Sequence, residues 1–167
     1  MLPCRHLAAL IAMYLVAGVA CTQQSPPRAS TLVPSDHVAP SPVGTTQTIL
    51  QKTFNLKSSA VFPFEIPAHA MQPHLHGMFL SFVGQVHGTA DETANISFLI
   101  MNEEQNAAFA SDRPSEAVFS VEDSHNQAVN YDLPASMNKP VKYYLVFRNS
   151  GGSKSSKVVE ADFRVDF

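Results

Sequence analysis

The clearest pattern in the chain is an unbroken alternation of apolar and charged residues at its C-terminal end. In VVEADFRVDF (158–167) a charged residue separates each pair of successive apolar positions, which are Val159, Ala161, Phe163, Val165 and Phe167. Successive side chains of a strand point to opposite faces. This period of two therefore predicts a strand with one buried face and one solvated face.

Four stretches upstream also predict strands. AVFPFEIPA (60–68) alternates in the same way, but its prolines confine it to a sheet edge or an interrupted strand. NISFLIM (95–101) is apolar on both sides, as in a covered central strand. VKYYLVFRN (141–149) is rich in the aromatic and β-branched residues that favour strands. GMFLSFVGQVHG (77–88) alternates, with an apolar face and a polar face. The apolar face has Met78, Leu80, Phe82 and Val86, and the polar face has Ser81, Gln85 and His87.

Turn-forming residues separate these strands at intervals of roughly eight to fifteen residues, and the chain shows no repeat of fixed period. Helix is scarce, although EEQNAAFA (103–110) is long enough for two helical turns. Many short strands with frequent turns are typical of an antiparallel β-sandwich. We therefore predict an all-β fold of about seven or eight strands over residues 45–167.

The N-terminal residues are organised like an export signal. Arg5 precedes an apolar run (7–20) that is too short to span a bilayer comfortably and that ends in small residues. The GVAC sequence at 18–21 resembles the lipobox of bacterial lipoproteins, with Gly18 where that family usually has leucine. The resemblance implies cleavage after residue 20, a diacylglycerol thioether on Cys21 and acylation, for example by palmitate, of the new amino terminus. The alternative is an ordinary secretory signal cleaved nearby, which leaves Cys21 as a free thiol.

The rest of the N-terminal region predicts how the folded domain is held. Cys4 leaves with the signal, so the mature domain has neither a disulfide nor a thiolate metal ligand. Residues 22–44 are dominated by Pro, Ser, Thr and Ala and predict a flexible tether. Thr22 follows Cys21, and by analogy with enterobacterial sorting the absence of aspartate there favours the outer membrane. The predicted organisation is a signal peptide (1–20), a lipid anchor with linker (21–44) and a β-sandwich (45–167), in the bacterial cell envelope.

The last thirty residues resemble known families. KPVKYYLVFRNSGGSKSSKVVEADFRVDF (139–167) is similar to the closing hairpin of uncharacterised exported bacterial β-sandwich domains and, more distantly, to the GOLD domains of eukaryotic Golgi-trafficking proteins. The shared features are an aromatic strand that ends at Asn149, a Ser/Gly-rich turn and an alternating strand that begins at Lys157. The resemblance implies a sandwich with an interaction or ligand-binding role, and it carries no catalytic residue.

One short segment, HAMQPHLHGM (69–78), concentrates soft metal ligands. The candidate ligands are His69, Met71, His74, His76 and Met78. Imidazole suits zinc and copper and thioether suits Cu(I), so copper is the favoured metal. His76-Gly77-Met78 is also similar to the H-x-M of periplasmic copper chaperones, although the earlier His/Met pair of that family is missing. The alternative is that Pro73 makes this segment a surface loop at the rim of the sandwich, with solvated imidazoles and no cofactor.

Composition and motifs narrow the function. The chain has 11 Lys+Arg against 14 Asp+Glu and no basic stripe, which argues against nucleic acid as a partner. It has no G-x-S-x-G motif, and we expect Ser81, Ser97 and Ser120 at outward strand positions. We therefore predict a non-enzymatic module, anchored to the membrane by its N-terminal lipid, that binds an envelope protein or a small ligand. A copper-binding protein is the first alternative, and a hydrolase with dispersed catalytic residues is the second.

Overall fold

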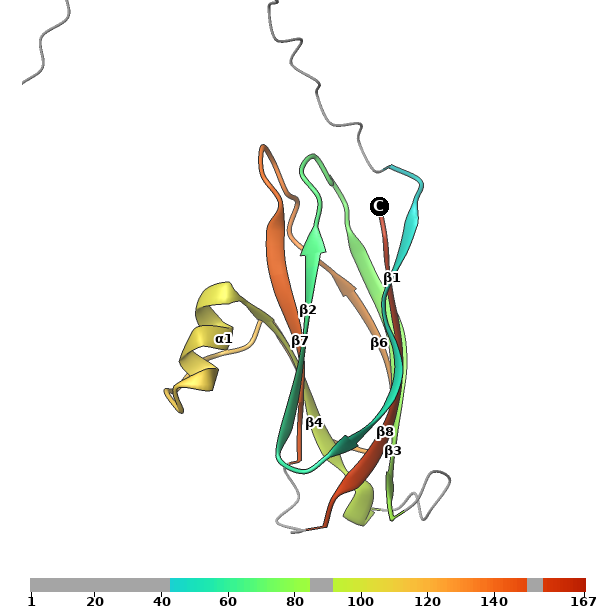
Figure 1. Cartoon of the computed structure of the whole chain (residues 1–167). Helices are drawn as coiled ribbons and strands as arrows, with labels where there is room; N and C mark the ends of the chain where they lie inside the picture. The colour runs from blue at the N-terminus through green and yellow to red at the C-terminus, as the bar shows by residue number, and fades with distance from the viewer. Residues whose placement is uncertain (1–42, 85–91, 150–154) are drawn as a thin grey trace, which may run out of the picture. The chain divides into compact units, whose positions relative to one another are not determined.

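The computed structural model describes residues 43–84, 92–149 and 155–167. The predicted signal peptide, Cys21 and almost all of the predicted tether lie outside the described residues, as do Gln85 and His87. Within the described residues the chain forms two four-stranded sheets whose strands pair antiparallel (Figure 1). The predicted all-β sandwich of seven or eight strands is confirmed.

The two sheets interleave along the chain. The first, sheet A, has the order β1 (Thr46–Leu56), β8 (Lys157–Asp166), β3 (His74–Val83) and β6 (Asn126–Asp132). The second, sheet B, has the order β2 (Ser59–Ile66), β7 (Val141–Arg148), β4 (Ile96–Asn102) and β5 (Phe119–Ser124). A short 3-10 helix, η1 (Glu92–Ala94), precedes β4, and one α-helix, α1 (Glu103–Ala110), follows it.

Three strands, β2, β4 and β8, take the positions that their sequences predicted. β8 lies in the interior of sheet A, and its apolar positions Val159, Phe163 and Val165 are fully buried. β2, which contains Pro63, is an edge strand paired only with β7. β4 and β7 are adjacent interior strands of sheet B, and α1 packs against both on the side away from sheet A, which is consistent with their apolar residues on both faces (Figure 1).

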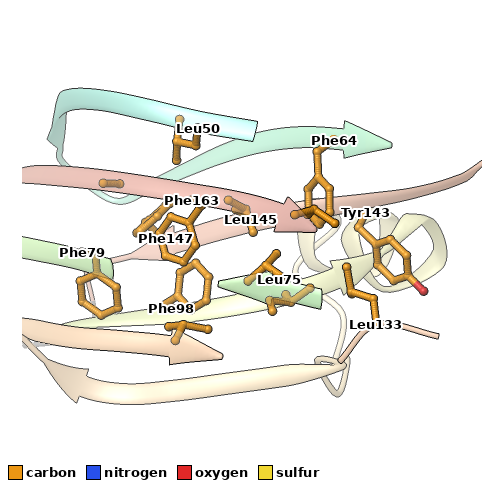
Figure 2. Close-up of a cluster of buried hydrophobic side chains, with 14 of the residues drawn as sticks. Leu50, Phe64, Leu75, Phe79, Phe98, Leu133, Tyr143, Leu145, Phe147 and Phe163 are labelled. Atoms are coloured by element: carbon orange, nitrogen blue, oxygen red, sulfur yellow. The ribbon is translucent and has the colours of Figure 1, made fainter. Parts of the chain in front are cut away.

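Aromatic side chains from both sheets fill the space between them (Figure 2). The rings of Phe98 and Phe163 stack with centroids 5.0 Å apart and an interplanar angle of 10°, and Phe147 packs against both rings. Phe98 and Phe147 belong to sheet B and Phe163 belongs to sheet A, so this cluster joins the two sheets. Aromatic pairs of this kind contribute roughly 0.5–1.5 kcal/mol each beyond the burial of their surface.

The inward face of β3 is the reverse of the one expected, because the alternation placed Met78, Leu80 and Phe82 on the apolar face and Ser81 on the other. Leu75, Phe79 and Ser81 point into the sandwich, whereas Met78 is 44% exposed on the opposite face. The expected outward position of Ser81 is therefore wrong. Its hydroxyl donates to the carbonyl oxygen of Ala94 at 2.5 Å, and a buried hydroxyl with a partner costs little.

Ser97 and Ser120 differ in their exposure to solvent. Ser97 alternates with the core residues Ile96 and Phe98 of β4, so it points away from sheet A as expected, but it is buried there. Ser120, on the edge strand β5, is exposed as expected.

Gly77 leaves space for the core residue Phe163. Gly77 lies opposite Phe163 in the register of β3 and β8. A Cβ atom at this position would come within 2.7 Å of Phe163 Cδ1, which is closer than real Cβ contacts allow. Glycine at position 77 therefore leaves space for the ring of Phe163, and any larger residue there would displace that ring.

The predicted two-turn helix is present as α1. It begins with a capping box, in which the side chain of Asn102 accepts from the backbone N–H of Gln105 and the side chain of Gln105 accepts from that of Asn102, both at 2.9 Å. These bonds satisfy two backbone donors that the first turn leaves free. The helix is consequently stable at its start, although none of its residues is fully buried.

A polar cluster closes the end of the sandwich at which β8 begins. Lys157 is buried, and its ammonium group donates to the carbonyl oxygen of Asn95. Burial lowers the pKa of Lys157, and the nearby Asp123 carboxylate opposes this effect. The side chain of Asn95 also contacts Nδ1 of His125 at 2.9 Å. These contacts hold the segment before β4 against β5, β6 and β8.

Candidate functional site: the outer face of sheet A

The strongest candidate site is the face of sheet A that points away from sheet B, which we call the outer face. It is built by side chains that alternate with the core residues of the same strands. β3 contributes His74, His76, Met78 and Leu80, β8 contributes Glu160, Asp162, Arg164 and Asp166, β6 contributes Ala128, Asn130 and Asp132, and β1 contributes Gln51 and Thr53.

Two shallow hollows adjoin on this face. One, of about 370 Å³, lies over Met78 and Leu80 and reaches Lys52 of β1 and Glu160 of β8. The other, of about 350 Å³, lies over Gly77 and Met78 and reaches Asn130 and Arg164. Both are bordered by Met78 and Asp162. The face therefore has an apolar floor with a rim of charged and amide side chains, which is the usual make-up of a small binding site.

A set of histidine and carboxylate contacts occupies one end of the outer face. His74 lies opposite both Asp132 and Asp166 in the register of the sheet, and its Nδ1 is 2.7 Å from Asp132 Oδ1. His76 Nε2 is 3.2 Å from Asp166 Oδ2. The hydroxyl of Thr46 donates to Asp166 Oδ1 at 2.6 Å. These contacts link all four strands of sheet A.

The electrostatic consequence falls on Asp166. The hydrogen bond from Thr46 is the main reason that the pKa of this carboxyl lies below its ordinary value, and the neighbouring His76 and His74 lower it further. Partial burial opposes the shift. Asp166 therefore stays ionised to lower pH than an isolated carboxylate, and it can hold a positive charge on either imidazole.

The structure places the five candidate copper ligands in two regions. His74, His76 and Met78 take successive outward positions on β3, and the two imidazole rings lie nearly parallel with centroids 6.0 Å apart. Met71 lines a third hollow together with His74. His69 belongs to the connection between β2 and β3, where its backbone has a left-handed φ of 63°.

The ligand geometry around these residues is limited. In the part of the chain that the structure describes, no three His, Cys, Asp or Glu side chains are grouped so that they could hold a metal ion. A site in this segment would have to combine the two imidazoles with the methionine thioethers. Copper binding thus stays a prediction that rests on His74, His76 and Met78 first.

Several residues of the outer face were not singled out from the sequence as site residues. Asp162 and Arg164 were recognised only as the wet side of an alternating strand, and Asn130 and Asp132 carried no signal. Their arrangement depends on strand order, which brings β6 and β8 to the two sides of β3. Arg164 and Asp162 also form an ion pair at 3.2 Å within the site.

Comparison with known proteins adds no family. No protein-family model matches the chain, and no curated protein sequence matches it.

Among the described residues no helix is both long and apolar enough to cross a membrane.

Replacing Thr46 by valine removes the hydroxyl that donates to Asp166, so we expect the pKa of Asp166 to rise toward its ordinary 3.8. A lowered carboxyl pKa stabilises the folded state above the ordinary value, and this contribution disappears as the pH falls through the lowered value. The deficit of Thr46→Val relative to wild type should therefore shrink on acidification. An NMR titration of the Asp166 carboxyl carbon and acid unfolding measure both effects, with the exposed Thr48→Val as control. An unchanged Asp166 titration would contradict the assignment.

Proposed function

We propose that this protein is a lipid-anchored, non-enzymatic binding module of the bacterial cell envelope, and that the outer face of sheet A holds its ligand. The observation that carries the proposal is the pair of adjoining hollows over Met78, which is 44% exposed in the middle of a mostly polar face. A solvated sheet face normally carries polar side chains, so an exposed apolar floor indicates a surface that contacts a ligand or a partner protein.

The dimensions and charge of the face indicate the kind of ligand. Hollows of about 350–370 Å³ that are open to solvent suit a side chain of a partner protein or a short extended segment better than an enclosed cofactor. The face carries the carboxylates of Asp132, Glu160, Asp162 and Asp166 and the permanent cation of Arg164. This acidic balance favours a partner that presents an apolar side chain beside a basic group.

The envelope location and the anchor are supported by the sequence. The GVAC motif ends an export signal at Cys21, and a segment rich in proline and serine separates that cysteine from the first strand. Lipidation at Cys21 would hold the sandwich in the outer membrane while leaving its sheet faces free. The proposal of a non-enzymatic role rests on the sequence, which contains no G-x-S-x-G motif.

The binding proposal is tested by site-specific photocrosslinking in cells that produce the full chain. With a photoreactive amino acid in place of Met78, we expect a defined crosslinked adduct with an envelope component, because this residue borders both hollows. Val61 provides the matched control, since it is an exposed apolar residue (40%) on β2 of sheet B. The same adducts in the same amounts from both positions would contradict a binding site on the outer face.

Copper binding is the second candidate function, and one observation favours it. His74, His76 and Met78 present two imidazoles and a thioether on one face of one strand, a donor set that suits copper in either oxidation state. Binding would require both imidazoles to release their carboxylate partners or to share them with the metal.

Titration of the purified protein with Cu(II) in air and with Cu(I) under anaerobic conditions tests this candidate. We expect a dissociation constant of about 1 μM or tighter that weakens at least tenfold in His76→Ala, because one of two imidazole ligands is lost. His125→Ala, which removes a histidine at the other end of β6, should bind like wild type. Weaker binding by wild type, or an unchanged constant in His76→Ala, would exclude the site.

A further inference from the structure

The end of the sandwich at which β3 begins is formed by two connections that are held together by hydrogen bonds. These are residues 67–73, between β2 and β3, and residues 133–140, between β6 and β7. The N–H of His69 donates to the carbonyl of Met137, and the N–H of Ser136 donates to that of Ala70, both at 2.9 Å. The buried hydroxyl of Ser136 donates to the carbonyl of Pro67 and accepts from the N–H of Ala70. These hydrogen bonds join the two connections to each other. We use the name tip for the two connections and Val43.

The tip exposes most of the large apolar side chains that the described residues leave in water. Met71 is 62% exposed, Met137 is 65% exposed and Val43 is 69% exposed. Only Val61 and Met78 among the described residues belong to the same category, and both lie elsewhere on β2 and β3. Exposed apolar side chains that gather at one end of a small domain mark a surface that contacts a partner or a membrane.

The charge of the tip is also distinctive. Residues 67–73 and 133–140 contain no aspartate or glutamate, and Lys139 is their only permanently charged residue. The carboxylates that border these segments, Glu65, Asp132 and Asp166, lie at or beside the ends of the adjacent strands. An uncharged apolar end with a lysine, bordered by acidic side chains, matches the interfacial layer of a bilayer, where apolar groups enter and carboxylates stay in water.

The polypeptide enters the domain at this same end. Val43 lines a hollow with Ala70 and Met71, and the N–H of Gly44 donates to the carbonyl of Phe167 at the end of β8. Figure 1 shows the start of β1 at the end of the sandwich where β2 connects to β3 and β6 connects to β7. Cys21 precedes Val43 by 22 residues in the sequence (43 − 21), so a lipid on Cys21 would be joined to the domain through the tip.

We infer that the tip is a membrane-contacting surface, in which Met71, Met137 and Val43 enter the headgroup and upper acyl region of the bilayer that holds the lipid anchor. The inference rests on the proposed lipid anchor and adds an orientation to it. Contacts of this type reach about 5–10 Å into the headgroup and acyl boundary. The anchor supplies a high local concentration at the bilayer, so a small apolar surface suffices to keep the domain seated on it.

Spin labelling of the full lipidated chain in vesicles of phosphatidylethanolamine with a minor share of phosphatidylglycerol tests this inference. Single cysteines replace Met71 or Met137 at the tip, and Val61→Cys, an exposed apolar position on β2, is the matched control. We expect labels at 71 and 137 to lose most of their collisions with a water-soluble nickel complex and to gain collisions with oxygen. The label at 61 should keep the accessibility of a residue in water.

The outcomes separate the tip from the anchor. On vesicle-bound protein, the labels at 71 and 137 could be as accessible to the nickel complex as the label at 61. This result would contradict the membrane contact of the tip and leave the proposed anchor intact. Protection that increases with the ratio of protein to lipid would assign the tip to contacts between copies and would also overturn it. Wild-type protein that accepts a spin label and stays in the soluble fraction would show a free Cys21, and the anchor would fail together with the tip.

Discussion

The structure depends on the packing of β8 between its neighbours and against sheet B. This strand inserts Val159, Phe163 and Val165 into the core, and the ring of Phe163 lies against Phe98 and Phe147 of the opposite sheet. Residues 43–167 contain no cysteine, so no disulfide joins the two sheets and such side-chain contacts hold them together. The space that Gly77 leaves beside Phe163 belongs to the same packing arrangement.

The same alternation that makes the core also makes the outer face. Each buried position of β8 fixes the orientation of the next residue, so Asp162, Arg164 and Asp166 point outward because Phe163 and Val165 point inward. β3 behaves likewise, with Leu75 and Phe79 inside and His74, His76 and Met78 outside. The candidate binding surface is therefore a consequence of core packing, and a shift of either strand by one residue would remove it.

The sequence predicted strands where a regular pattern or an apolar run was strong, as in β8, β4 and β7. It did not predict β1, β5 and β6 individually, since these edge strands bury few residues and their patterns are mostly polar. The orientation of Ser81 was missed because the carbonyl of Ala94, which satisfies its hydroxyl, comes from a distant segment. The contacts of His74 and His76 with Asp132 and Asp166 required the strand order and register, and neither is encoded in a local pattern.

The proposed surfaces serve different purposes in one arrangement. The tip would face the bilayer, and the strands of sheet A run away from it, so the outer face would lie alongside the membrane normal and remain open to a partner in the envelope. The histidine- and methionine-rich segment spans both surfaces, since His69 and Met71 belong to the tip and His74, His76 and Met78 belong to the outer face. This division offers an explanation for its composition that does not need a single metal site.

The alternation on β8 is tested most directly by comparing two alanine variants of neighbouring residues in equilibrium unfolding. Phe163→Ala should lower the free energy of unfolding by about 3–5 kcal/mol, because it empties the centre of the core. Arg164→Ala should change it by no more than about 0.5 kcal/mol, because this side chain lies on the solvated face with a surface ion pair. Equal losses in the two variants, or a larger loss for Arg164→Ala, would contradict the packing on which both the fold and the outer face depend.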